Sequence, residues 1–99
     1  MPGPISRHAA IRIRKDVVSR ELEGEMVLLN LATGVYFGLD PVGTRIWRLI
    51  EAQRSSDEIV ETLTAEYEVD ANTAGADLAR LLLALRDNEL VDVDDGSAR

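Results

Sequence analysis

Residues 26–41 read MVLLNLATGVYFGLDP, and they set two apolar runs around a short connection. The connection Ala-Thr-Gly contains glycine and is typical of a β-hairpin loop. A loop of these three residues predicts that Leu31 pairs with Val35, Leu29 with Phe37, and Val27 with Leu39. We expect these six apolar side chains to share the core face of the hairpin. The other face then carries a milder set: Leu28, Asn30, Tyr36 and Gly38.

The second run, 35–39, carries neither charge nor proline, so an edge position would leave it open to pairing with another strand. Upstream, Ile11 and Ile13 alternate with arginines, and Val17 and Val18 follow. This pattern predicts one earlier strand between Ile11 and Glu21, with charged residues along its edge. We therefore expect a three-stranded antiparallel β-meander. Its third strand, 35–39, has no charged residue or proline to prevent pairing with another strand.

Three helices follow this meander. Asp40-Pro41 is a favoured helix start and predicts a helix to about Glu51. Ser55 and Glu58 have capping-box spacing and predict a second helix to about Glu68. Asp70 caps the third, whose apolar stripe is Ala74, Leu78, Leu81, Leu82 and Leu85. We assign three aromatic residues to the core: Phe37, Trp47 and Tyr67. The predicted fold is α+β, with a flexible N-terminal arm over residues 1–10, one domain over 11–92 and an acidic tail over 93–99.

Composition argues against catalysis. The 99 residues contain no cysteine and one histidine, His8, which falls in the predicted arm. Thiolate nucleophiles and cysteine metal sites are thereby excluded. We expect no enzyme activity, no cofactor and no metal site. No apolar run is long enough for a signal peptide or a membrane span, so we expect a cytoplasmic protein with no membrane partner.

Charge is distributed unevenly along the chain. The net charge is −7, and residues 55–79 hold seven carboxylates and no cation. Such a surface repels a polyanion and attracts a basic peptide or protein face. An ordinary solvated acidic surface explains the same pattern, so the charge alone does not choose a partner.

The ordered combination of residues 27–40, 42–47, 56–60 and 67–70 with Leu90-Val91 resembles the PqqD-like family, named for the pyrroloquinoline quinone biosynthesis protein D. The resemblance implies a winged-helix-like precursor-peptide recognition element without enzyme activity. Such domains hold the leader segment of a ribosomally made peptide for a separate modifying enzyme, such as a radical enzyme or a leader peptidase. One departure is Glu89, where the family often has glycine; Asn88 is then the candidate for a left-handed helix cap.

The resemblance also implies where the leader would bind, as an added strand beside the third helix. The implied peptide-binding residues are Val35, Tyr36, Phe37, Gly38, Leu39, Asp77, Arg80, Leu81 and Ala84.

Two other interpretations stay open at this point. A winged-helix DNA-binding regulator has a similar set of elements, although the acidity of residues 55–79 argues against a nucleic-acid partner. The open strand 35–39 also suits pairing with a second copy of the chain. We therefore expect either a monomer or a homodimer.

Overall fold

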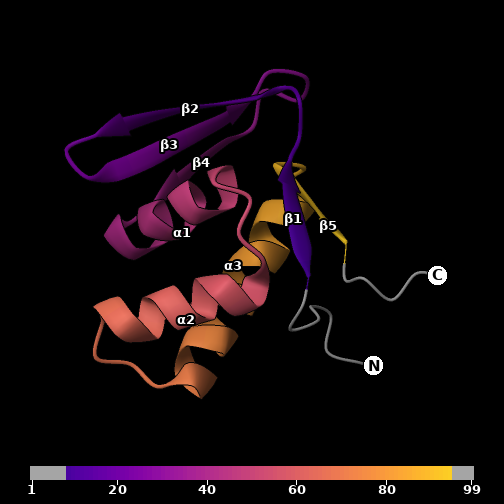
Figure 1. Cartoon of the computed structure of the whole chain (residues 1–99). Helices are drawn as coiled ribbons and strands as arrows, with labels where there is room; N and C mark the ends of the chain where they lie inside the picture. Colours follow the sequence, from indigo (N-terminus) through magenta and orange to yellow (C-terminus); the bar gives the residue numbers. More distant parts are fainter. Residues whose placement is uncertain (1–8, 95–99) are drawn as a thin grey trace.

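The computed structural model describes residues 9–94, which fold as a three-stranded sheet over three helices with a two-stranded ribbon at one side (Figure 1). The elements run β1 (Ala10–Ile13), β2 (Val17–Leu22), β3 (Glu25–Asn30), β4 (Tyr36–Leu39), α1 (Pro41–Glu51), α2 (Ser56–Glu66), α3 (Ala71–Asp87) and β5 (Val91–Asp94). The predicted fold class, with a meander followed by three helices, is confirmed.

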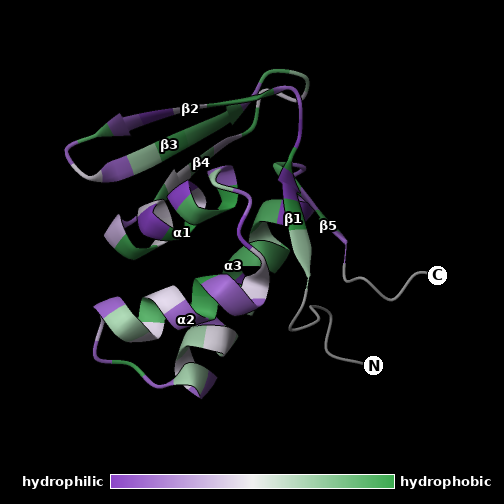
Figure 2. Ribbon diagram, viewed as in Figure 1, coloured by the Kyte–Doolittle hydropathy of each residue, from purple (hydrophilic) through white to green (hydrophobic). Residues whose placement is uncertain are grey.

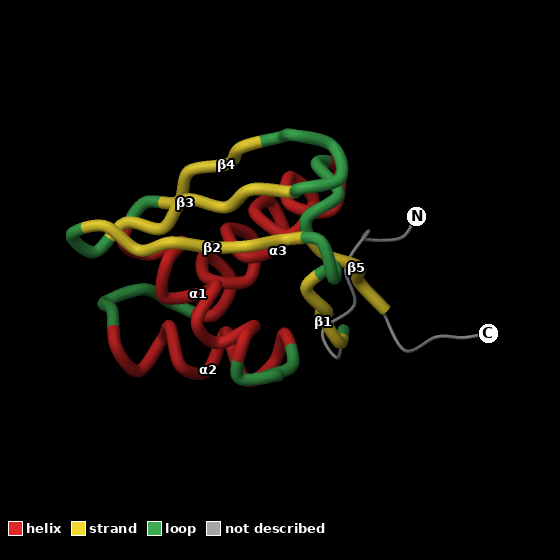
Figure 3. The backbone as a smooth tube through the Cα atoms, turned by 90° about the horizontal axis from the view of Figure 1, so that it is seen from above, coloured by secondary structure: helices red, strands yellow, loops and turns green. Residues whose placement is uncertain are grey.

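The meander is β2-β3-β4, with β4 at one margin, and Figure 3 shows its three strands side by side above the helices. The single early strand predicted between Ile11 and Glu21 is wrong, because a turn at residues 14–16 divides it into β1 and β2. β1 leaves the meander and pairs antiparallel with β5. β5 extends through Asp94, across the predicted start of the tail at 93, and β1 includes Ala10. Most of the predicted arm, with His8, and most of the tail lie outside the described residues.

The predicted hairpin register is wrong by one residue. Met26 pairs with Leu39 and Leu28 with Phe37, because the loop is one residue longer than expected. Asn30 closes it: its N–H donates to the Val35 carbonyl at 3.0 Å, and its carbonyl accepts from the Gly34 N–H at 2.7 Å.

That single step turns β3 over, since side chains alternate along a strand. Met26, Leu28 and Asn30 are buried, whereas Val27 and Leu31 are exposed, Leu31 by 62%. The facing of β4 is as predicted. Phe37 and Leu39 point toward the core, and Tyr36, 70% exposed, points outward.

The three helix starts are confirmed. Asp40 accepts from the Gly43 N–H at 2.7 Å, Ser55 and Glu58 form a reciprocal capping box, and Asp70 accepts from the Thr73 N–H at 2.8 Å. Figure 2 shows hydrophobic and hydrophilic residues alternating around the helices, as expected for helices buried on one side.

One core joins the helices to both sheets. Its buried members include Ile11, Met26, Leu28, Leu39, Ile46, Trp47, Ile50, Ile59, Leu63, Leu78, Leu82, Leu85, Leu90 and Val91. Phe37 packs partly buried against this core. Tyr67 is 38% exposed, so its core assignment is wrong. The reason is that α2 ends at Glu66, and Tyr67 is an extended cap residue that has left the buried helical face.

Candidate functional site

The outer edge of β4 offers unused backbone hydrogen-bonding groups. The bond from Asn30 to Val35 fixes which residues of β4 bond to β3. In an antiparallel ladder these alternate, so Phe37 bonds to β3 and its two neighbours do not. The N–H and C=O groups of Tyr36 and Gly38 therefore point away from the sheet. No other strand of the described structure covers this edge.

A groove of about 580 Å³ lies beside that edge. It is formed by β4, the first turns of α1 and the middle of α3, and its lining residues are Phe37, Gly38, Leu39, Asp40, Val42, Gly43, Ile46, Asp77, Arg80 and Leu81. The apolar side chains among them come from all three elements. An extended ligand at the β4 edge would thus meet backbone groups on one side and an apolar surface on the other.

Gly43 allows α1 to begin close to β4. A Cβ atom at this position would lie 3.2 Å from Asp40 Oδ1 and 3.2 Å from Leu39 Cδ2, closer than ordinary van der Waals contact. Since residue 43 has no side chain, the first turn of α1 can lie close to β4 and form one wall of the groove.

The charged rim of the groove belongs to α3. Arg80 Nη1 donates to Asp77 Oδ1 at 2.9 Å, and the two side chains are 73% and 53% exposed. An exposed pair one helical turn apart contributes little to stability, typically less than about 1 kcal/mol. Either group can therefore turn to an opposite charge on a ligand at small cost.

The predicted site residues fall into two sets. The structure brings Phe37, Gly38, Leu39, Asp77, Arg80 and Leu81 together around the groove. Tyr36 lies on the same edge but outward, Val35 lies just before β4, and Ala84 is absent from the lining. Sequence reasoning missed the α1 contribution of Val42, Gly43 and Ile46. A usable signal existed, since a helix that begins directly after the edge strand must place its first turns beside that strand.

Hydrogen bonds from remote residues hold the walls of the groove in place. The buried Thr44 hydroxyl accepts from the Met26 N–H at 2.9 Å and lies 3.5 Å from the Leu39 carbonyl, so α1 joins β3 and β4. The Asn30 side-chain amide donates to the Glu89 carbonyl at 2.6 Å and ties the hairpin to the chain just after α3.

An ion pair fixes α1 to the end of α2. Arg45 bonds Glu66 through two hydrogen bonds, of 2.9 and 2.6 Å. The hydrogen bond to Arg45 lowers the pKa of Glu66, and the same contact raises the pKa of Arg45. α1 thus contacts the sheet through Thr44, and it contacts α2 through Arg45.

Comparison with known proteins places the chain. Residues 25–91, which include the open strand and the groove, match the family model described as coenzyme PQQ synthesis protein D, PqqD. The chain belongs to the PqqD family. No curated protein matches the sequence.

Two solved structures resemble this PqqD-family chain closely. One is TbiB1 in complex with the TbiA(beta) leader peptide, with 46% identity over 89% of this chain and 99% of the other, and a TM-score of 0.80. The second is a lasso peptide synthetase B1 complexed with the leader peptide, with 28% identity over 83% of this chain and 96% of the other, and a TM-score of 0.77.

Within residues 9–94, no group of three or more His, Asp or Glu side chains is arranged to hold a metal ion. None of the three helices in this part of the chain is long and apolar enough to cross a membrane.

Proposed function

We propose that this chain is a non-catalytic adaptor that binds the leader segment of a ribosomally made precursor peptide and presents it to a separate modifying enzyme. The leader would add as a strand to β4. The observation that carries the proposal is the open edge of β4 next to an apolar groove. The likeness to two proteins solved with leader peptides supports it.

Backbone pairing alone would be too weak. Tyr36 and Gly38 offer four backbone groups, and each hydrogen bond contributes about 1 kcal/mol net. Ordering about five leader residues costs on the order of 5–10 kcal/mol of backbone entropy. Each apolar leader side chain buried in the groove would add about 1.5–3 kcal/mol, so two or three of them bring binding into a useful range. The strand fixes register, and the groove selects sequence.

This division predicts the pattern of a suitable leader. Alternate side chains of an added strand point to opposite faces of the sheet. One set would enter the groove toward Phe37, Ile46 and Leu81. The other set would lie beside Tyr36 on the outer face. We therefore expect apolar leader residues at every second position along the paired segment, with a charged residue where the strand passes Asp77 and Arg80.

The carboxylates of the groove support an adaptor rather than an enzyme. Asp40 is engaged in capping α1, and Asp77 is paired with Arg80. The chain has no cysteine to act as a nucleophile. The modifying chemistry is therefore assigned to the partner enzyme. No observation favours the DNA-binding alternative.

Hydrogen exchange at single amides tests this function. The probes are the TbiA(beta) leader peptide and the leader of any short precursor peptide found to be encoded beside this gene. We expect the leader to slow exchange at Tyr36 and Gly38, whose N–H groups face outward, and to leave Phe37, already bonded to β3, unchanged. A leader with proline at its central paired position serves as the control and should give no protection.

Two results would contradict the proposal. One is unchanged exchange at Tyr36 and Gly38 with both leaders at saturating concentration. The other is protection of these amides that rises with protein concentration and ignores peptide, which would assign the edge to a homodimer instead.

A further inference from the structure

The two-stranded ribbon has an open edge of its own, on β1. The Arg14 N–H donates to the Leu90 carbonyl at 3.1 Å, which fixes the alternation of the β1–β5 ladder. By that alternation Arg12 bonds to β5, whereas the N–H and C=O groups of Ile11 and Ile13 point away from it. No third strand lies against β1 in the described part of the chain.

A second groove, of about 610 Å³, lies along β1. The end of α1 and the start of α2 form its far wall, and its lining includes Ile11, Arg12, Ile13, Ile50, Arg54 and Glu58. One step before the strand, Ala9 donates to Ser56 Oγ at 3.0 Å and its carbonyl accepts from the Ser56 N–H at 3.0 Å. The backbone groups of Ala9 that point away from β5 are thus bonded to α2. The corresponding groups of Ile11 and Ile13 face the groove.

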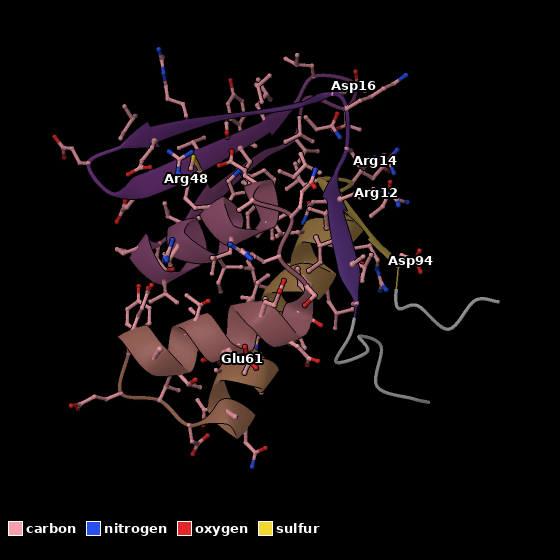
Figure 4. All side chains as sticks on the ribbon, in the orientation of Figure 1. Arg12, Arg14, Asp16, Arg48, Glu61 and Asp94 are labelled. Atoms are coloured by element: carbon pink, nitrogen blue, oxygen red, sulfur yellow. The ribbon has the colours of Figure 1, made fainter. Side chains whose placement is uncertain are left out.

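The lining of this groove contains two arginines and two glutamates. Its carboxylates are engaged: Glu51 accepts from Arg48 at 2.9 Å, and Glu58 accepts from the Ser55 N–H at 2.9 Å. Its two arginines, Arg12 and Arg54, are exposed and have no ion-pair partner among residues 9–94. Figure 4 shows Arg12, on β1, and Arg14, just after it, projecting on the same side.

Arg54 is held at the groove by the end of α1. Gln53 takes a left-handed conformation, its N–H donates to the Ile50 carbonyl at 2.9 Å, and the Arg54 N–H donates to the Leu49 carbonyl at 3.0 Å. These are the two bonds of a Schellman motif. The position of the Arg54 backbone is therefore fixed.

β5 indicates what kind of strand suits β1. It reads Val-Asp-Val-Asp, with Val93 opposite Ile11 and Asp92 opposite Arg12. The Asp92 carboxylate is bonded to Arg14 at 3.0 Å, so Arg12 is left without a carboxylate of its own. A strand on the open side would find the same alternation of isoleucine and arginine, and cross-strand pairs of opposite charge stabilise a sheet.

We propose that the open edge of β1 is a second docking site, which takes an extended acidic segment of another protein with alternating apolar and carboxylate side chains. Its apolar side chains lie against Ile13, and its carboxylates lie beside Arg12 and Arg54. This site belongs to a different sheet from β4 and does not depend on the leader proposal.

The probe is the peptide acetyl-Val-Asp-Val-Asp-Val-amide, titrated into the full isotope-labelled chain and followed by amide NMR. We expect the largest shifts and slowed exchange at Ile11 and Ile13, with the Arg12 amide unchanged because it is already bonded to β5. The matched peptide with lysine in place of aspartate should bind at least tenfold more weakly. Raising the salt concentration should weaken the acidic peptide, since the attraction is between exposed charges.

The variant Arg12→Glu/Arg54→Glu should reverse the preference between the two peptides and leave leader binding at β4 unchanged. Because Arg12 lies opposite Asp92, Arg54→Glu alone is the second variant; it leaves the ribbon intact and should weaken the acidic peptide several-fold. Equal binding of the two peptides, shifts confined to Tyr36 and Gly38, or loss of protection at Arg12 through displacement of β5 would each overturn the proposal.

Discussion

The side-chain amide of Asn30 donates a 2.6 Å hydrogen bond to the backbone carbonyl of Glu89. The same side chain accepts from the N–H groups of Ala32 and Thr33, at 2.8 and 3.1 Å. Asn30 is buried, and it therefore sets the hairpin loop and the distance between the hairpin and α3 at once. The groove lies between these two elements, so its width depends on a residue that does not line it.

Asn30→Ala should destabilise the fold by about 1–3 kcal/mol, because buried hydrogen-bonding groups lose their partners. Urea unfolding measures this change. Asn72→Ala, on an exposed position of α3, is the control and should change stability by less than about 0.5 kcal/mol. Equal effects of the two substitutions would contradict the structural role of Asn30.

Substitutions at Gly38 distinguish pairing of β4 with β3 from pairing of β4 with the leader. A Cβ at this position meets nothing within 4 Å, so Gly38→Ala should keep both the fold and leader binding. Gly38→Pro removes an outward N–H that β3 does not use and should weaken leader binding on the order of tenfold. Titration of the TbiA(beta) leader against both variants, with urea unfolding to check the fold, measures the difference. Proline binding as tightly as alanine would exclude pairing at this residue.

Glu89 adopts a left-handed conformation, with φ of 60°. The end of α3 has the two bonds of a Schellman motif: the Glu89 N–H donates to the Arg86 carbonyl, and the Leu90 N–H donates to the Leu85 carbonyl. The prediction that Asn88 supplies this conformation is wrong, since its φ is −94°. Glu89→Gly should raise the free energy of unfolding by about 0.5–1 kcal/mol through relief of this strain. Glu68→Gly, at an exposed residue without positive φ, should not stabilise the protein, and thermal unfolding compares the two.

Acid should weaken the helical half of the molecule. The hydrogen bond to Arg45 lowers the pKa of Glu66, and the hydrogen bonds to Thr73 lower that of Asp70. A carboxyl group whose pKa is lower in the folded state stabilises the fold above its ordinary pKa, and this contribution is lost as pH falls through the folded value. We expect the midpoint temperature of thermal unfolding to decrease when the pH is lowered below about 4, the ordinary pKa range of these carboxyl groups.

The double variant Glu66→Gln/Asp70→Asn isolates this contribution, because asparagine remains a good helix cap. Its thermal midpoint should depend less on pH below about pH 4 than that of the parent chain. Parallel curves for the two proteins would assign the acid sensitivity to other carboxylates.

The helices could be predicted from sequence because their start signals are local. Asp40-Pro41, the Ser55 and Glu58 pair, and Asp70 each act within four residues of the helix they begin. The family pattern includes Asp40, Glu58 and Asp70 among its residues. These features carry the fold class without knowledge of any tertiary contact.

The register and the ribbon could not be predicted in this way. Asn30 closes the hairpin loop with hydrogen bonds inside the loop. The partner of its buried side-chain amide, however, is the carbonyl of Glu89, far along the chain. β1 and β5 have four residues each and come from opposite ends of the described chain, so their pairing has no local signal. The α3 residues of the groove also have no local signal, and only the family resemblance implied them. The α1 wall does have one, because α1 begins directly after β4.

The Thr44 hydroxyl of α1 accepts from the Met26 N–H of β3 and lies 3.5 Å from the carbonyl of Leu39, the residue paired with Met26 in the hairpin. The Met26 amide is therefore a reporter built into the protein. Its exchange rate measures how often α1 lifts from the sheet, whereas the neighbouring amides measure how often the strands themselves come apart. A single spectrum can thus distinguish two kinds of opening that heat or denaturant would merge.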